Sequence, residues 1–216
     1  MTKIEPSEIN RYSSPEYALS YLAKSDHIPH RTEVEAVVLE LLPARVGRIL
    51  DLGTGDGRLM ALAKLARPDA HGVATDISPT MLEKARLRFA ESKDVSVVAH
   101  DLNEPLPDLG TFDVILSSFS IHHVSDERKQ GLYREIFDIL EPGGIFCNLE
   151  HVSSPTPRLH EDFYEAMGAT LWDEDPSNKC GSVEIQIDWL RHIGFKDVDC
   201  FWKWRELALL SGVKPA

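Results

Sequence analysis

One stretch of this sequence, DLGTGDG at residues 51–57, joins a short apolar run to a helical pattern. Its three glycines stand at alternate positions, Gly53, Gly55 and Gly57, where the absence of a Cβ lets the backbone turn tightly and approach a ligand closely. The apolar run before it, 47–52, predicts a strand, and open α/β sheets bind ligands at the carboxyl ends of their strands. The stretch therefore predicts a ligand-binding loop in an α/β fold.

Short runs rich in Val and Ile alternate with helical patterns along most of the chain. The runs predict strands at 47–52, 71–75, 95–99, 112–117 and 144–149, and the helical patterns fall at 57–65, 79–92, 127–140 and 182–193. Two last runs, 198–202 and 206–210, predict a hairpin that adds an antiparallel edge. The order predicts an α/β fold with a doubly wound, mostly parallel seven-stranded sheet, helices on both faces and an antiparallel C-terminal strand.

Composition and charge exclude several classes of protein. The 216 residues, 43% of them apolar, suffice for one well-filled core. A net charge of −12 repels phosphate backbones and anionic membranes, so we expect neither nucleic acid nor membrane as a partner. Three scattered cysteines, a polar N-terminus and the absence of a membrane-length apolar run predict a cytoplasmic protein without a cysteine metal site.

The acids around the glycine loop narrow the choice of ligand. A dinucleotide fingerprint that starts at Gly53 needs Gly or Ala at position 58, where Arg58 stands. Asp51 and Asp56 would repel a pyrophosphate, but they would attract a ligand that carries positive charge on a sulfonium and an amine. The loop therefore favours a sulfonium cofactor with an amino-acid tail.

From Arg48 to Gly144 the sequence resembles the class I S-adenosylmethionine-dependent methyltransferase family, whose first motif is acidic-x-Gly-x-Gly-x-Gly. Four later pieces resemble the family in the right order: Asp76-Ile77-Ser78, His100-Asp101-Leu102, FDVILSS at 112–118 and LEPGG at 140–144. The resemblance implies a Rossmann-like domain that takes S-adenosyl-L-methionine as methyl donor and releases S-adenosyl-L-homocysteine.

The resemblance also implies a donor site. Asp76 would accept hydrogen bonds from the ribose hydroxyls, Ile77 would pack on the adenine, and Asp101 would contact the adenine amine. The implied donor-binding residues are Asp51, Gly53, Thr54, Gly55, Gly57, Asp76, Ile77, Met81, Asp101, Leu102, Ser117 and Ser118.

The resemblance divides the single domain into parts. Residues 1–45 are expected to form an N-terminal helical lid, and residues 46–216 the methyltransferase domain, with an acceptor-binding insertion at about 152–181. In related enzymes the second lid helix covers the donor, so Arg31 at its start is implied to hold the donor's carboxylate in a bidentate pair. The alternative is an ordinary surface arginine in a first helical turn.

Three histidines, His122, His123 and His151, follow the fourth and fifth predicted strands. Imidazole titrates near neutral pH, so each is a candidate general base for an acceptor whose proton must leave. The alternative is that they only shape their loops. We expect no metal site, because adjacent residues of an extended segment point in opposite directions and His122 and His123 would not share an ion.

Aromatic residues stand among acids in the predicted insertion, at Phe163, Tyr164 and Trp172. The mixture suits a cationic or amine acceptor, but the pattern favours a helix with one apolar face and one acidic, solvated face.

The leading prediction is a methyltransferase that acts on a small molecule by in-line transfer. One alternative is an enzyme that forms carboxy-S-adenosylmethionine for tRNA wobble-uridine modification, which needs an arginine near the sulfonium; Arg191 and Arg205 are its C-terminal candidates. Another is a non-catalytic domain that binds S-adenosylmethionine or a nucleotide. The sequence leaves open the acceptor, the atom methylated, the use of a base, and the choice between monomer and homodimer.

Overall fold

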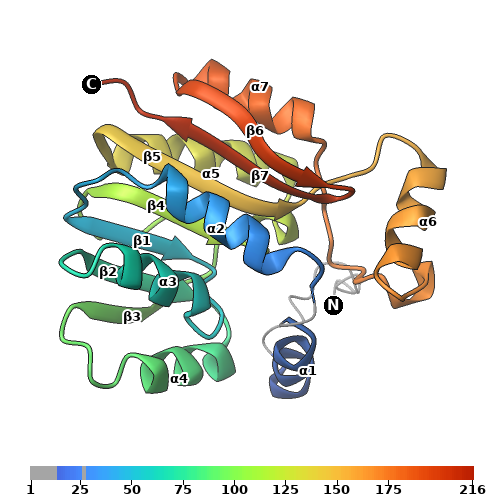
Figure 1. The fold of residues 1–216 in the computed structure, drawn as a ribbon, viewed down its shortest axis with the longest axis horizontal. Coiled ribbons are helices and arrows are strands. Elements are labelled where there is room, and N and C mark those ends of the chain that lie inside the picture. Colours follow the sequence, from blue (N-terminus) through green and yellow to red (C-terminus); the bar gives the residue numbers. More distant parts are fainter. Residues whose placement is uncertain (1–13, 26–27) are drawn as a thin grey trace, which may run out of the picture.

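The computed structural model describes residues 14–25 and 28–216 (Figure 1). Seven strands form one sheet: β1 (Arg48–Leu52), β2 (His71–Asp76), β3 (Val95–Ala99), β4 (Phe112–Ser118), β5 (Leu140–His151), β6 (Lys196–Trp204) and β7 (Leu207–Val213). Their order is β3-β2-β1-β4-β5-β7-β6, and β1 to β5 run parallel. This confirms the predicted seven-stranded, mostly parallel sheet.

The predicted C-terminal hairpin adds an antiparallel edge to the parallel strands, as expected, with β7 as its inner strand. β7 runs antiparallel to both β5 and β6, so β6 forms the edge. Burial explains the order: β7, with the sequence LALLSGV, is buried along all but its last residue, whereas every second residue of β6 faces solvent. An apolar strand such as β7 is best placed inside the sheet, where strands on both sides pair with its backbone. β6, which alternates exposed and less exposed residues, can form the edge of the sheet.

Helices cover both faces of the sheet (Figure 1). The helices are α1 (Pro15–Ser25), α2 (Arg31–Leu41), α3 (Arg58–Ala66), α4 (Pro79–Arg88), α5 (Asp126–Ile139), α6 (Pro157–Ala166) and α7 (Val183–Ile193), with short 3-10 turns η3 (Ile121–His123) and η4 (Leu171–Asp173). α2 and α3 contribute to one buried cluster, and α5 and α7 to another on the opposite face. None of the helices in the described part of the chain has the length and apolarity of a membrane span.

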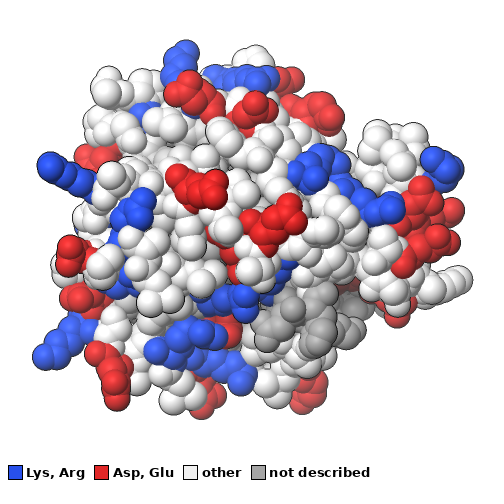
Figure 2. All heavy atoms as spheres, in the orientation of Figure 1, with Lys and Arg blue, Asp and Glu red and all other residues white. Residues whose placement is uncertain are grey.

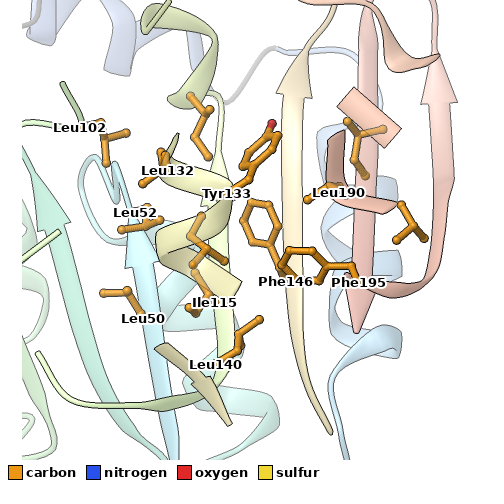
Figure 3. Close-up of a cluster of buried hydrophobic side chains, with 14 of the residues drawn as sticks. Leu50, Leu52, Leu102, Ile115, Leu132, Tyr133, Leu140, Phe146, Leu190 and Phe195 are labelled. Atoms are coloured by element: carbon orange, nitrogen blue, oxygen red, sulfur yellow. The ribbon is translucent and has the colours of Figure 1, made fainter. Parts of the chain in front are cut away.

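Successive residues of the central strands contribute their side chains alternately to the two hydrophobic clusters. Ile49 belongs to the cluster under α2 and α3, and Leu50 to the cluster under α5 and α7, as the two-residue period of a strand requires. Figure 3 shows the second cluster, which contains Leu50 and Ile115 of the strands and Tyr133 of α5, whose ring lies beside that of Phe146. The sheet is thus held from both sides, and its strand ends stay fixed.

The largest differences from the predicted element boundaries are four residues, at the end of α4 and at the start of β5. α4 ends at Arg88 and not at 92, because the Ser92 N–H donates to the Phe89 carbonyl at 2.9 Å and closes a turn. β5 begins at Leu140 and not at 144, because Leu140 already pairs with Phe112 before a shift of register. The predicted lid, 1–45, includes residues 1–13 and 26–27, which lie outside the described residues; the rest of it contains α1 and α2.

Candidate active site

The glycine loop connects β1 to α3 in a conformation that glycine favours. Gly53, Gly55 and Gly57 have φ angles of 65°, 59° and 84°. A Cβ at Gly53 would lie 1.8 Å from Oγ of Ser120, which no side chain tolerates. The Gly55 N–H donates to Oδ2 of Asp76 at 2.8 Å, so the loop is tied to the end of β2.

The loop forms one wall of a cavity at the carboxyl ends of β1 to β4, which we call the glycine-loop cavity. The space between its walls is about 870 Å³, which includes open solvent at its mouth. The predicted residues that line it are Arg31, Asp51, Gly53, Thr54, Gly55, Asp76, Ile77, Met81, Asp101, Leu102, Ser118 and His123. The topology therefore brings most of the predicted donor-site residues together.

Two predicted donor-site residues, Gly57 and Ser117, are not among the lining residues. Ser117 is fully buried, and its hydroxyl donates to the Leu52 carbonyl at 3.0 Å between neighbouring strands. Gly57 caps α3, and a Cβ there would lie 2.5 Å from the Phe89 ring. Both residues hold the loop and its strands in place.

Asp51 is fully buried at the end of β1. Its Oδ2 accepts a hydrogen bond from Oγ1 of Thr54 at 2.6 Å, while its Oδ1 has no hydrogen-bond partner among the described residues. Burial raises the pKa of this carboxyl to about 7. An unpaired buried carboxylate oxygen is costly, so the site suits a ligand that brings positive charge or an N–H donor.

Asp76 closes the other side of the loop at the end of β2. Its Oδ1 and Oδ2 accept backbone N–H bonds from Ser78 and Gly55, both at 2.8 Å. Burial raises the pKa of Asp76 against these hydrogen bonds, which favour the ionised form. An ionised carboxylate has about four acceptor sites, so Asp76 keeps capacity for donors from a ligand.

Arg31 lies in the first turn of α2 and lines the cavity. It is only 9% exposed, so the surface-arginine alternative is wrong. Its Nε donates to Oε1 of Glu35 at 3.0 Å, and the same Glu35 carboxylate pairs with Arg58 at 2.7 and 2.8 Å. This network fixes two guanidinium groups in the lining of the glycine-loop cavity.

A second, wider cavity adjoins the first, because Tyr21 and Phe119 line both. We call it the histidine chamber. Its further lining residues include His122, His151, Ile28, Phe163, Tyr164, Met167, Asp173, Asp175, Asn178 and Leu207. Phe163 and Tyr164 of the predicted insertion reach the chamber from α6, whereas Trp172 is 96% exposed and lies outside it.

The candidate histidines are held by different groups. His122 Nδ1 lies 2.5 Å from Oε1 of Glu150, and His151 Nε2 lies 2.9 Å from Oε2 of Glu206. His123 Nδ1 lies 3.1 Å from Oγ of Ser177, and His123 lines the glycine-loop cavity. His122 and His123 belong to η3, with ring centroids 4.1 Å apart, so the expectation of an extended segment was wrong. No group of three or more metal-ligating side chains occurs within residues 14–25 and 28–216.

Residues 49–144 match the model of a family described as a methyltransferase domain. A demethylmenaquinone methyltransferase of Clavibacter sepedonicus is 33% identical over 201 residues, which cover 84% of this chain and 79% of that protein. This chain belongs to the class I S-adenosylmethionine-dependent methyltransferases. A carboxy-S-adenosyl-L-methionine synthase of Helicobacter hepaticus is also similar, at 24% identity over 87% of each chain.

Solved structures show the same fold at low identity. Phosphoethanolamine N-methyltransferase 2 of Haemonchus contortus, in complex with S-adenosyl-L-methionine, has a TM-score of 0.71 at 17% identity. The match covers all of this chain and 61% of that one. An O-methyltransferase family protein of Burkholderia thailandensis has a TM-score of 0.70 at 21% identity, over 86% of this chain and 56% of that one. The methyltransferase described here thus spans a little over half of the latter protein.

Burial sets the charge states in the chamber of this methyltransferase. It lowers the pKa of His122 well below its usual range and that of His123 to about 3, and it raises the pKa of Glu150 to about 7. Burial acts to raise the pKa of Glu206 too, but hydrogen bonds from His151, Ser154 and His160 outweigh it and lower that pKa. At neutral pH His122 is therefore uncharged, while Glu206 is ionised.

Some residues that line or support the two cavities were not among the predicted site residues. Tyr21 and Phe119 line both cavities. Glu206, which supports His151, is 55 residues away from it along the chain. No motif marks these positions. Glu206 is brought to His151 by the pairing of β5 with β7, which no local pattern reports.

Proposed function

We propose that this methyltransferase binds S-adenosyl-L-methionine in the glycine-loop cavity and transfers its methyl group to a small apolar acceptor in the histidine chamber. The observation that carries this proposal is that the two cavities adjoin at Tyr21 and Phe119, so a donor and an acceptor can meet there. Such a transfer is an in-line displacement, for which the protein must mainly align the acceptor and exclude water.

The residues of the glycine-loop cavity fit the donor group by group. Asp51 offers its unpartnered Oδ1 to the donor's amine, and Arg31 offers a guanidinium to its carboxylate. Asp76 accepts from the ribose hydroxyls, and Ile77, Met81, Asp101 and Leu102 surround the adenine. When bound, S-adenosyl-L-methionine supplies an activated methyl group on a sulfonium.

The chamber favours a neutral, apolar acceptor. Phe119, Phe163, Met167 and Leu207 give it apolar walls, and among the described lining residues there is no Lys or Arg to hold an anionic group. The acidic net charge of −12 and the interspersed acids and bases on the face in Figure 2 argue against a nucleic acid acceptor. The name of the Clavibacter relative, a demethylmenaquinone methyltransferase, supports an aromatic apolar acceptor.

The histidines supply a base where the acceptor carries a proton that must leave. His122 and His151 line the chamber, each with a carboxylate partner, and His123 lines the glycine-loop cavity. General base catalysis contributes about 10²–10⁴-fold to a rate.

Calorimetry tests the donor site directly. We expect the purified chain to bind S-adenosyl-L-methionine and S-adenosyl-L-homocysteine, and Asp76→Ala to abolish or strongly weaken binding of both. Asp69→Ala, an exposed acid beyond α3, is the matched control and should bind as the wild type does. A circular dichroism melt shows whether Asp76→Ala still folds. Absence of binding by the wild-type chain would overturn the proposal.

The similarity to the Helicobacter carboxy-S-adenosyl-L-methionine synthase supports a second candidate function, the formation of carboxy-S-adenosylmethionine. Its arginine candidates, however, lie elsewhere: Arg191 donates to the Val198 carbonyl at 3.0 Å, and Arg205 stacks on Trp204 with 5.7 Å to the ring centroid. Neither lines one of the two cavities. Mass spectrometry of the co-purifying ligand separates the two functions, because a carboxylated donor would favour the synthase. Ligand binding without methyl transfer to any acceptor in a screen would favour a non-catalytic domain.

A further inference from the structure

The two chamber histidines have buried carboxylate partners that lead to different parts of the molecule. From His122 the hydrogen bonds run to Glu150, then from Asn148 to Glu150 Oε2 at 3.5 Å and to Tyr133 at 3.2 Å. Tyr133 in turn donates to Gln186 at 2.6 Å. Glu150, Asn148, Tyr133 and Gln186 are all fully buried, so this network ends inside the protein.

The network behind His151 reaches the surface. His151 Nε2 lies 2.9 Å from one Glu206 oxygen, and His160 Nδ1 lies 2.9 Å from the other. His160 Nε2 lies 3.5 Å from Glu174 Oε2. Along this path the exposed fraction of the side chains runs from 12% and 1% to 29% and 37%. Glu206, His160 and Glu174 line an open cleft next to residues 153–157, which we call the outer cleft.

We propose that His151 takes the acceptor's proton and that Glu206, held in place by His160, carries it from the histidine chamber to the outer cleft. This inference rests on the proposed function, because it needs a methyl acceptor with an O–H or N–H group. Glu206 and His160 do not touch the acceptor and act as positioning and relay residues.

Each proton transfer on this path has a donor and an acceptor among the groups present. An ionised carboxylate only accepts, so Glu206 fixes the proton of His151 on Nε2 and leaves Nδ1 unprotonated; Nδ1 has no hydrogen bond within the described part of the chain. The acceptor's bond to hydrogen breaks, its electron pair forms the bond to the methyl carbon, and the proton moves to Nδ1 of His151. The Nε2 proton then passes to Glu206, which lines the outer cleft and releases it to solvent there, while His160 keeps its own Nδ1 proton as a donor to Glu206.

Charges around the path agree with this direction. Hydrogen bonds from His151, Ser154 and His160 outweigh burial and lower the pKa of Glu206, and burial of His160 is outweighed by Glu206, which raises the pKa of that histidine. Besides Glu206, His122 and Glu150 contact His151, and Tyr164, Asp173 and Asp175 line the histidine chamber with it. Glu150, with a pKa of about 7, is a weaker counter-ion for an imidazolium than the ionised Glu206.

Nuclear magnetic resonance of the ¹⁵N-labelled full chain tests the relay without any acceptor. We expect His151 to carry its proton on Nε2 at neutral pH, and Glu206→Gln to lower the pKa of His160. His160→Gln should shift the ring ¹⁵N resonances of His151, whereas His192→Gln on α7, whose Nδ1 lies 2.6 Å from the Asp188 carbonyl, should not. A proton on Nδ1 of His151, or His151 resonances indifferent to His160→Gln, overturns the relay.

A kinetic readout separates a relay from a merely structural network. With 1,4-dihydroxynaphthalene as probe acceptor, Glu206→Gln should lower kcat about 10- to 100-fold and shift its pH profile, with unchanged affinity for the donor. A wild-type pH profile in a folded Glu206→Gln variant contradicts the proposal. Loss of S-adenosyl-L-homocysteine binding by the wild type would overturn the proposed function, while the tautomer and coupling results still decide the relay.

Discussion

The Asp51 carboxyl is buried at the end of β1, with Oδ2 bonded to Thr54 and Oδ1 without a hydrogen-bond partner among the described residues. Burial raises its pKa from 3.8 to about 7. A carboxyl whose pKa is raised by folding stabilises the folded state only while it stays protonated. Its contribution is present below about pH 4 and is lost as the pH rises through about 7.

We therefore expect Asp51→Asn to stabilise the unliganded protein and to weaken donor binding. Above pH 7 the variant no longer carries a buried charge without a full set of partners, so its free energy of unfolding should rise by about 1–3 kcal/mol. Urea unfolding at acid and at mildly alkaline pH measures the gain, which should vanish at the acid end. A gain that is equal at both ends would show that ionisation of Asp51 is not its cause.

Gly53 and Gly55 allow two reasons for a glycine to be told apart: lack of space for a Cβ, and a positive φ angle that strains other residues. Gly53 and Gly55 have similar φ angles, 65° and 59°, but a Cβ at Gly53 would meet Ser120 at 1.8 Å and a Cβ at Gly55 would meet nothing within 4 Å. We expect Gly55→Ala to cost about 1–2 kcal/mol of stability and Gly53→Ala clearly more, with loss of donor affinity. Urea unfolding and calorimetry measure both.

The double variant Gly53→Ala with Ser120→Gly is the internal control. It removes the side chain that the new Cβ would meet and leaves the φ angle unchanged, so its stability should approach that of Gly55→Ala. If the double variant stays as unstable as Gly53→Ala alone, the contact with Ser120 is not the reason for the glycine.

The glycine loop shows how far prediction from sequence reaches at the level of elements. The spacing of Gly53, Gly55 and Gly57 after an apolar run fixes a strand-loop-helix unit, because local backbone rules suffice for it. The inner position of β7 depends on which strand is apolar on both faces, and η3 depends on how His122 and His123 pack; neither has a local signature. Ser120 and Glu206 join the site only through tertiary contacts.

At the same scale, one hydrogen bond connects α1 to the loop that follows η4. The Tyr17 hydroxyl donates to Oδ2 of Asp175, and Oδ1 of Asp175 accepts from Ser177, which holds His123. This chain of contacts runs from α1 to His123 in the lining of the glycine-loop cavity. α1 is therefore coupled to the position of His123.

We expect Tyr17→Phe to loosen α1 without unfolding the sheet. The variant removes one hydrogen bond to an ionised group, worth about 1.5–3 kcal/mol, from an element at the periphery. Hydrogen exchange followed by mass spectrometry should show faster exchange in 15–25 and unchanged exchange in β1 and β4. Ser20→Ala, on the same helix, is the control. Equal protection of α1 in Tyr17→Phe and wild type would contradict the coupling.

At the scale of the whole molecule, the net charge favours the proposed function over the tRNA-linked alternative. The chain carries a net charge of −12, and the face in Figure 2 has acids among its bases. Polyanion binding depends on cations that displace counterions from the phosphates, and the described lining of the histidine chamber includes no Lys or Arg. A small neutral acceptor meets no such barrier.

We therefore expect no measurable binding of tRNA at physiological salt by fluorescence anisotropy, under conditions where calorimetry detects S-adenosyl-L-homocysteine. Any residual binding at low salt should disappear steeply as salt is added, because only local Lys and Arg side chains would support it. Saturable tRNA binding that survives physiological salt would contradict this expectation. It would reveal a basic surface that outweighs the net charge, and it would move the acceptor from the chamber to the outside of the protein.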